Sequence, residues 1–302
     1  MGLYNRGRFK HDASHLRLRG PLGLGFEWEA GNIRIARNCV GCRKLMVVKG
    51  NRVKELLRKG ETTVGTWITI GNPDVAELIA HMGVDWLVFD TEHAPLDVGT
   101  VQVLMQATSG TEVTPIVRVA WNDLVLIKRA LDIGAQGLVV PWVNSEADAV
   151  RAVQAARYPP RGLRGAGPRR AAMYGLDKDY MVDADTKLMI VVQIETSQAV
   201  ENAEKILAVD GVDAFFIGPR DLSVSMGIQD RRNSNAYNLA VNKVLAAGSK
   251  LGVPAGIMCH SEDEIKSAVR QGFKFVALGS DYDYLAWGAK MALGASGRNM
   301  RT

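Results

Sequence analysis

The amino-acid sequence predicts an α/β fold: a (β/α)8 TIM barrel, formed by a single domain that follows an irregular N-terminal extension. From about residue 63 onward, eight short apolar runs alternate with helical patterns. The runs are mostly continuous and rich in Val, Ile and Phe, which is typical of parallel strands buried on both faces. Eight strand–helix units in about 240 residues match the size of this barrel. A doubly wound sheet is the alternative, but GNPD at residues 71–74 is not the glycine-rich phosphate turn that usually follows its first strand.

The first 45 residues differ from the rest of the chain. Nine Lys and Arg residues against three acidic ones make residues 1–45 basic, whereas residues 46–302 are close to neutral. Gly, Arg and Asn are scattered through this segment without helical or strand periodicity. An amphipathic helical pattern begins after Met46. We therefore expect a basic extension over 1–45, either poorly ordered or preceding the natural start, and a barrel domain over 46–302. Cys39 and Cys42 form a lone C-x-x-C pair, which supplies too few ligands for structural zinc.

The predicted strands and helices follow one another in strict alternation. The strands are residues 64–70, 86–90, 115–119, 137–140, 188–194, 214–217, 254–258 and 275–278. The helices are residues 74–81, 101–109, 124–131, 146–156, 198–207, 236–252 and 262–270, with a last one from residue 283. The segment 157–185, which contains YPPRGLRGAGPRR, is longer than a structural turn requires, so we expect it to shape the site or an interface.

Composition excludes several classes of protein. Apolar residues make up 47% and charged residues 23% of the chain, which is ordinary for a globular protein. No apolar run approaches the roughly 18 residues needed to span a bilayer. Three cysteines are too few for a disulfide framework and fit a reducing compartment, so we expect a cytoplasmic protein. The neutral body indicates no nucleic-acid or membrane partner, and the basic extension lacks interleaved stacking aromatic residues beyond Tyr4, Phe9 and Trp28.

Polar residues gather where the predicted strands end. Catalytic groups of a (β/α)8 barrel lie just after the carboxyl ends of the strands. In chain order these positions hold Asn72, then Asp90, Glu92 and His93, then Arg118, Pro141 and Trp142, Gln193 and Glu195, Gly218, Arg220 and Asp221, His260, and finally Ser280 and Asp281. This concentration predicts a catalytic site at that end of the barrel.

Glu195 and Asp221 are candidate metal ligands. Each follows an apolar strand, in VVQIET and FFIGPRD, and the two strands are neighbours in the predicted barrel. Two carboxylates at one barrel mouth suit Mg²⁺ or Mn²⁺, with Co²⁺ as a further candidate, and Gln193 adds a polar group nearby. Two solvated carboxylates, or an acid/base pair of the glycosidase type, are the alternatives.

The segment GPRDLS at residues 218–223 is a candidate anion cradle. Pro219 has no N–H, so the N–H groups of Arg220 and Asp221 would receive a substrate carboxylate at the start of a short helix. The alternative is a plain N-cap formed by Asp221 or Ser223.

Arg118 and His93 are candidate catalytic groups. Arg118 ends an apolar strand and would bind an anion or polarise a carbonyl, unless it only forms a structural salt bridge. His93 follows Asp90 by three residues and is a candidate general base. Asp132 could orient a histidine, but it lies between the third helix and the fourth strand, at the opposite end of the barrel. Either a second subunit brings Asp132 to His93, or Asp132 is structural.

Together these motifs resemble the HpcH/HpaI aldolase family, the metal-dependent class II 2-keto-acid (pyruvate) aldolases, such as those of 4-hydroxy-2-oxo-heptanedioate and 2-dehydro-3-deoxy-glucarate. The matching segments, in order over residues 63–282, are GTWITIGNP, FDTEHAP, PIVRVAWND, KRALDIGAQGLVVPWV, YPPRGLRGAG, VVQIET, GPRDLS and ALGSD. The resemblance implies a (β/α)8 barrel and a homo-oligomer, commonly a hexamer or trimer of dimers with helices exchanged between subunits. Residues 1–45 match nothing in the family.

The resemblance also implies roles for single residues. Glu195 and Asp221 look like the metal ligands, and Gln193 looks like the amide beside the metal. Arg118 looks like the residue on the keto oxygen. His93 looks like the base, acting through a metal-bound water, with Asp132 as its partner and Asp90 supporting the histidine loop. Gly218, Arg220 and Asp221 look like the carboxylate cradle.

The implied reaction is the reversible cleavage of a 4-hydroxy-2-oxo acid to pyruvate and an aldehyde through a metal-bound enolate. The partners would therefore be small molecules, a 2-keto acid and an aldehyde. No strand end carries a lysine for a Schiff base, which argues against a class I aldolase. Oxaloacetate decarboxylation through the same enolate, and a non-catalytic barrel that binds keto acids, are the alternatives.

Overall fold

The structure is a computed structural model that describes residues 16–19, 25–29, 32–35, 50–229 and 234–298. The chain divides into two compact units, residues 1–49 and 50–302. The described residues do not include the C-x-x-C pair, Cys39 and Cys42, or Met46, the expected start of the domain. No helix within the described ranges is both long and apolar enough to cross a membrane.

Three short strands in the first unit differ from the sequence prediction. β1 (Leu16–Arg19), β2 (Gly25–Glu29) and β3 (Asn32–Ile35) pair in this order as an antiparallel sheet, although no strand periodicity was expected before residue 45. The register places Leu18 opposite Phe26 and Trp28 opposite Ile33. The apolar residues therefore alternate with period two, a pattern that the basic residues between them obscured.

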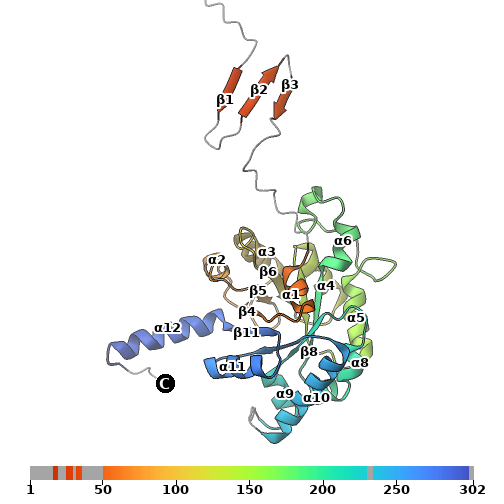
Figure 1. Ribbon diagram of the computed structural model, residues 1–302, viewed down its shortest axis with the longest axis vertical. Coiled ribbons are helices and arrows are strands. Elements are labelled where there is room, and N and C mark those ends of the chain that lie inside the picture. Colours follow the sequence, from red (N-terminus) through yellow and green to blue (C-terminus); the bar gives the residue numbers. More distant parts are fainter. Residues whose placement is uncertain (1–15, 20–24, 30–31, 36–49, 230–233, 299–302) are drawn as a thin grey trace, which may run out of the picture. The chain divides into compact units, whose positions relative to one another are not determined.

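The second unit is a closed barrel of eight parallel strands, as predicted (Figure 1). The strands are β4 (Thr63–Ile68), β5 (Trp86–Asp90), β6 (Thr114–Arg118), β7 (Gly137–Val140), β8 (Met189–Ile194), β9 (Ala214–Ile217), β10 (Ala255–Met258) and β11 (Phe275–Ser280). They pair in sequence order, and β11 closes the ring onto β4. This arrangement brings the carboxyl ends of all eight strands to one rim, which is where such barrels place their chemistry.

The helices alternate with the strands along the second unit. They are α1 (Arg52–Arg58), α2 (Pro73–Ala80), α3 (Val98–Ala107), α4 (Leu124–Asp132), α5 (Glu146–Ala156), α6 (Tyr180–Lys187), α7 (Ser197–Glu201), α8 (Ala203–Leu207), α9 (Pro219–Ser225), α10 (Asn235–Leu251), α11 (Glu262–Arg270) and α12 (Asp281–Ala295). The expected helix over 198–207 is two helices, α7 and α8, because the backbone leaves the helical region at Asn202. The segment 157–185 also contains a 3₁₀ turn and the start of α6, which the sequence did not indicate.

The barrel interior is filled by large aromatic side chains. Trp67, Trp86, Phe216 and Phe275 contact one another with ring centroids 4.0 to 6.1 Å apart, and all four are buried. A Cβ on Gly65 would lie only 2.1 Å from the Trp86 ring, so this strand position must be glycine for the ring to fit. The interior is a packed core and not a channel.

Helix α1 closes the amino-terminal end of the barrel. Val53 and Leu57 join the interior cluster. The Lys54 ammonium donates to the Leu188 carbonyl (2.6 Å) and to Asp213 (3.0 Å), and burial lowers its pKa. Residues 188 and 213 directly precede β8 and β9, so α1 fastens the starts of these strands.

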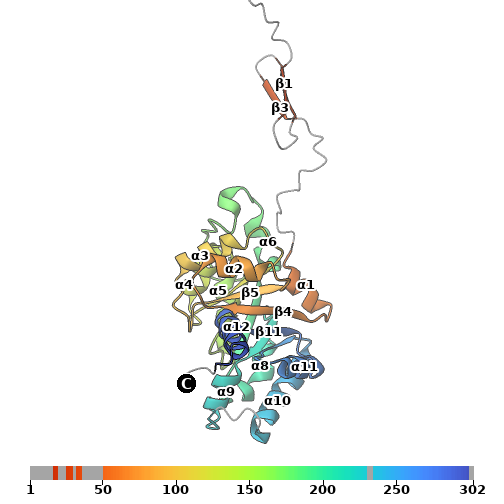
Figure 2. The same ribbon diagram turned by 90° about the vertical axis from the view of Figure 1, so that its left-hand side faces the viewer.

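Helix α12 projects away from the barrel wall (Figures 1 and 2). Every described residue from 285 to 298 is exposed, and large apolar side chains such as Leu285, Trp287 and Met291 are among them. A helix with such a surface is typical of an element that is covered by another chain.

Removal of the first 45 residues is expected to leave the barrel intact. All eight strands, α1 and the strand-end residues lie after residue 50, so a chain that begins at Met46 contains the complete second unit. We expect its melting temperature to change by less than about 2 °C, which corresponds to at most about 1 kcal/mol in a domain of this size. Differential scanning calorimetry of both chains checks this, and a larger loss would show that the extension stabilises the barrel.

Candidate active site

Asp90 and Arg118 form a buried ion pair at the barrel mouth. They end the adjacent strands β5 and β6 and stand opposite each other in the strand register. Arg118 donates from Nε to Asp90 Oδ1 (2.9 Å) and from Nη2 to Asp90 Oδ2 (2.6 Å), which is the bidentate geometry of a strong pair. The Arg118 guanidinium also lies 5.9 Å from the centre of the Trp67 ring, directly above the aromatic interior. The salt bridge that was the alternative role for Arg118 therefore exists, and it fixes this side chain at the mouth.

Asp90 also organises the loop that carries His93. Its Oδ1 accepts hydrogen bonds from the N–H groups of Glu92 (3.0 Å) and His93 (3.3 Å). One buried carboxylate thus holds both the Arg118 side chain and the loop after β5. The His93 side chain is 62% exposed, and its Nε2 lies 3.9 Å from Glu92 Oε1.

Glu195 is buried where β8 ends, and two donors orient it. Its Oε1 accepts a hydrogen bond from the Trp142 N–H (2.7 Å), and its Oε2 accepts one from Gln193 Nε2 (2.5 Å). Trp142 adopts a left-handed backbone conformation (φ 56°), which is unusual for a residue other than glycine and is common at functional sites. Thr196 caps α7 directly afterwards, so the chain turns away as soon as the carboxylate has been placed.

Burial, together with the negative charges of Glu92 and Asp221, raises the pKa of Glu195 to about 7, against the opposite effects of the Trp142 N–H and Arg118. Burial likewise raises the pKa of Glu92 to about 7, with Asp90 and Asp221 adding to the effect and Arg118 opposing it. Four carboxylates and one guanidinium therefore share this mouth, so the negative charge is in excess.

The strand-to-helix turn after β9 brings Asp221 to the same rim. Gly218 is the N-cap of α9 and has no capping side chain, so the alternative of an N-cap at Asp221 or Ser223 is wrong. No described residue accepts a hydrogen bond from the N–H groups of Arg220 and Asp221, which is the arrangement that an anion cradle requires. Both side chains are exposed. A Cβ on Gly218 would lie 2.9 Å from Glu195 Oε2, so glycine keeps this turn close to the carboxylate.

The residues at the mouth fit a divalent cation. The side-chain oxygen of Gln193, Oε1, is buried and accepts no hydrogen bond within the described residues, so it is available as a further oxygen beside Glu195. The described part of the chain holds no cluster of three or more His, Cys, Asp or Glu side chains arranged as metal ligands. Two carboxylates with a nearby amide are instead the donor set of a cation that keeps several waters or substrate oxygens, as Mg²⁺ and Mn²⁺ do.

Asp132 lies apart from the other predicted site residues. It ends α4, before β7 begins, at the barrel end opposite to His93. Its Oδ1 accepts a hydrogen bond from Arg164 Nη2 (2.7 Å), and the buried Arg164 guanidinium lies 4.6 Å from the centre of the Tyr158 ring. Within one chain Asp132 therefore pairs with Arg164 and not with His93.

Comparison with known proteins agrees with this geometry. A sequence model of the HpcH/HpaI aldolase/citrate lyase family matches residues 63–286, which span the whole barrel and every site residue above. The chain belongs to this family.

Relatives in the HpcH/HpaI family are similar along most of their length. The chain is 40% identical to a hydroxypyruvate/pyruvate aldolase of Sagittula stellata over 76% of this chain and 92% of the relative. It is 41% identical to a 4-hydroxy-2-oxo-heptane-1,7-dioate aldolase of Salmonella arizonae over 80% of this chain and 92% of the relative. A crystal structure of a family protein from Burkholderia cenocepacia superposes with a TM-score of 0.79 at 35% identity, covering 82% of this chain and 99% of the other. These similarities identify the protein as a carbon–carbon lyase of the retro-aldol type.

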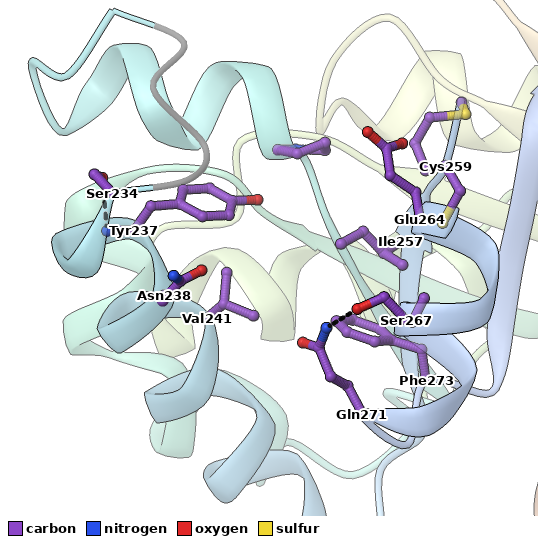
Figure 3. A pocket seen from close by; sticks show the side chains of 13 residues that line it. Ser234, Tyr237, Asn238, Val241, Ile257, Cys259, Glu264, Ser267, Gln271 and Phe273 are labelled. Atoms are coloured by element: carbon purple, nitrogen blue, oxygen red, sulfur yellow. Dashed lines mark hydrogen bonds between the residues drawn. The ribbon is translucent and has the colours of Figure 1, made fainter. Parts of the chain in front are cut away.

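A separate cavity of about 790 Å³ lies between α10 and α11, outside the barrel wall (Figure 3). Tyr237 and Asn238 line it from α10, and Ser267 and Gln271 line it from α11. None of the nine site residues predicted from the sequence lines it. Pro219, which lies between Gly218 and Arg220, is among the other lining residues.

Two contributors at the mouth received no role in the sequence analysis. Glu92 appeared there only as a polar residue after a strand, and it lies between Arg118 and His93. Trp142 appeared only as a position after the fourth strand, and its backbone N–H orients Glu195. A backbone N–H donor cannot be recognised from the residue type. The acidic residue next to the histidine in FDTEHAP, in contrast, could have indicated a role for Glu92.

Proposed function

We propose that this protein is a divalent-metal-dependent aldolase that reversibly cleaves a 4-hydroxy-2-oxo acid to pyruvate and an aldehyde. The observation that carries the proposal is the convergence of Arg118 and Glu195 at one mouth, where burial raises the pKa of Glu195 to about 7 and carboxylates outnumber cationic groups. The residues that end or directly follow the eight strands include no lysine, so the enolate must be stabilised by charge and not by a Schiff base.

Glu195 and Asp221 would hold the cation, with Gln193 beside them, and Mg²⁺ or Mn²⁺ fits this donor set, with Co²⁺ as a further candidate. The bound cation would act as a Lewis acid on the keto and carboxylate oxygens of the substrate. Arg118 would donate to the same keto oxygen and stabilise the negative charge that develops there when the C3–C4 bond breaks. Gly218 and the N–H groups of Arg220 and Asp221 would receive the carboxylate.

His93 would exchange the proton between the substrate and solvent. It follows Asp90, whose carboxylate fixes the loop, and its exposed ring is in contact with water. This places an imidazole, the side chain that most often serves as a general acid or base, beside the mouth.

We further propose that the protein is a cytoplasmic homo-oligomer, a hexamer built as a trimer of dimers. The exposed apolar side chains of α12 support this, because a second copy would cover them. In such an assembly a second copy would bring its Asp132 to His93, because within one chain Asp132 pairs with Arg164.

Hydrogen exchange at the pyruvate methyl group tests the proposed function without any aldehyde. In D₂O with Mg²⁺ or Mn²⁺, the wild-type protein should replace the methyl hydrogens of pyruvate, and proton NMR follows the loss of signal. His93→Ala should slow this exchange by about 10²-fold, the lower range for a positioned general base, because the ring is exposed. Exchange that needs no divalent ion, or no exchange at all, would contradict the proposal.

A further inference from the structure

Glu92 is a largely covered carboxylate, and its buried Oε2 accepts no hydrogen bond from any described residue. Only 8% of its side chain is exposed. Its Oε2 lies 3.1 Å from Arg118 Nη1 without hydrogen-bond geometry, and its Oε1 lies 3.9 Å from His93 Nε2. Asp90, two residues earlier, accepts four hydrogen bonds. Glu92 is therefore ion-paired with Arg118 but has hydrogen-bonding capacity left at Oε2, which a hydroxyl group of a bound substrate can use.

The surroundings of Glu92 show where that donor would be. Arg118 lies on one side, and the negative charges that act on Glu92 come from Asp90 and Asp221. Glu92 in turn acts on Glu195. Glu92 therefore lies beside Arg118, the residue proposed to contact the keto oxygen, and close enough to the two candidate metal ligands to be affected by their charge.

His93 does not share this position. Its ring is 62% exposed, whereas Glu92 lies 3.1 Å from Arg118 Nη1 and 3.9 Å from His93 Nε2. A proton that passes between the substrate and His93 therefore meets Glu92 on the way.

We propose that Glu92 is a catalytic residue that accepts the proton of the substrate's C4 hydroxyl and relays it to His93. The inference rests on the proposed aldolase function. In cleavage, the O–H bond at C4 breaks and its proton moves to Glu92. The oxygen lone pair forms the aldehyde carbonyl, and the C3–C4 bond pair becomes the enolate that Arg118 stabilises. Glu92 then passes its proton to His93 and on to solvent. A proton delivered to C3 along the same path completes pyruvate, so no co-reactant is consumed.

The first test is Glu92→Gln, assayed in the full-length protein with Mn²⁺ on 4-hydroxy-2-oxopentanoate, with pyruvate release as the readout. Glutamine keeps the shape of the side chain but cannot take a proton. We expect kcat to fall by about 10²-fold or more while KM changes by less than about threefold. Glu262→Gln is the matched control, because Glu262 is 78% exposed on α11 and pairs with Lys266.

A double variant tests the relay itself. If Glu92 and His93 act in series, Glu92→Gln with His93→Ala should be no slower than the slower single variant, because either change already interrupts one path. Glu92→Ala should regain part of its rate as formate is added, since a small carboxylate can enter the vacated space. A residue that only supports the fold would show neither effect.

The outcomes separate the two levels of inference. If wild-type protein cleaves no 4-hydroxy-2-oxo acid and does not exchange pyruvate hydrogens, the aldolase proposal itself fails. If wild-type protein cleaves the substrate and Glu92→Gln keeps kcat within about threefold of the wild-type value, only the relay is overturned. The relay is also overturned if the decrease in rate of the double variant is the product of the decreases of Glu92→Gln and His93→Ala. If thermal unfolding shows that Glu92→Gln does not fold, Glu92→Asp replaces it in the test. Aspartate keeps a negative charge beside Arg118, but its shorter side chain moves the carboxylate away from the substrate. We expect kcat of Glu92→Asp to fall by the same factor, and full activity would overturn the relay.

Discussion

Replacement of Glu195 by alanine is expected to abolish catalysis and to weaken divalent-cation binding strongly. Glu195 is the buried member of the proposed ligand pair, held by the Trp142 N–H and by Gln193, whereas Asp221 is exposed. Removal of a charged ligand should decrease the affinity for the cation by more than the roughly 10–100-fold that is typical when a residue hydrogen-bonded to a ligand is removed. Calorimetric titration with Mn²⁺ measures this directly, with Glu201→Ala, an exposed acid on α7, as the control.

The same titration should depend on pH in a defined direction. Because burial raises the pKa of Glu195 to about 7, its carboxyl group stays protonated in a range where an exposed Glu is ionised. A cation must displace that proton, so affinity should rise as pH increases from about 5 to 7 and level off above. Unchanged affinity across this range, or full activity in EDTA, would contradict the proposed ligand role.

Arg118→Ala is expected to reduce turnover by about 10³-fold, the upper range for loss of one group that stabilises an oxyanion. The variant also leaves Asp90 and Glu92 without their cation, so the free energy of unfolding should fall by about 3–5 kcal/mol, as it does for broken buried pairs. Steady-state kinetics and urea denaturation measure the two effects separately.

Arg118→Lys distinguishes catalysis from support of the fold. Lysine restores the positive charge and therefore part of the stability, but an ammonium cannot bind Asp90 in a bidentate manner and still point a donor at the substrate. We expect a stable protein with only partial activity. If stability and activity recover in proportion, Arg118 has the purely structural role that was the alternative.

The barrel could be predicted from the sequence because its strands are buried on both faces. Runs such as residues 86–89 and 214–217 are continuously apolar, and that pattern is typical of parallel strands. The antiparallel strands before residue 36 were missed because arginine and glutamate alternate with their apolar residues. The break between α7 and α8 was missed because Asn202 is tolerated inside a helix, so the residue type does not signal the change of backbone angle.

The candidate site was predictable to the extent that strand ends determine it. Asp90, Arg118 and Glu195 lie together because adjacent parallel strands bring their ends together, which sequence order already implies. Contacts across larger separations were not predictable. The pairing of Asp132 with Arg164 depends on the path of a long connection, and the Trp142 N–H that orients Glu195 depends on one backbone angle.

The filled interior of the barrel determines the order in which molecules pass through the site. Trp67, Trp86 and Phe275 block the path below Arg118, and α1 closes the far end, so the mouth is both entrance and exit. In the proposed reaction the pyruvate half is held deepest, against Arg118 and Glu195, and the aldehyde half lies nearer to solvent. The aldehyde must then depart before pyruvate, and in the synthetic direction pyruvate must be seated before any aldehyde arrives. The packed core that stabilises the fold thereby also fixes the order in which substrates bind and products leave.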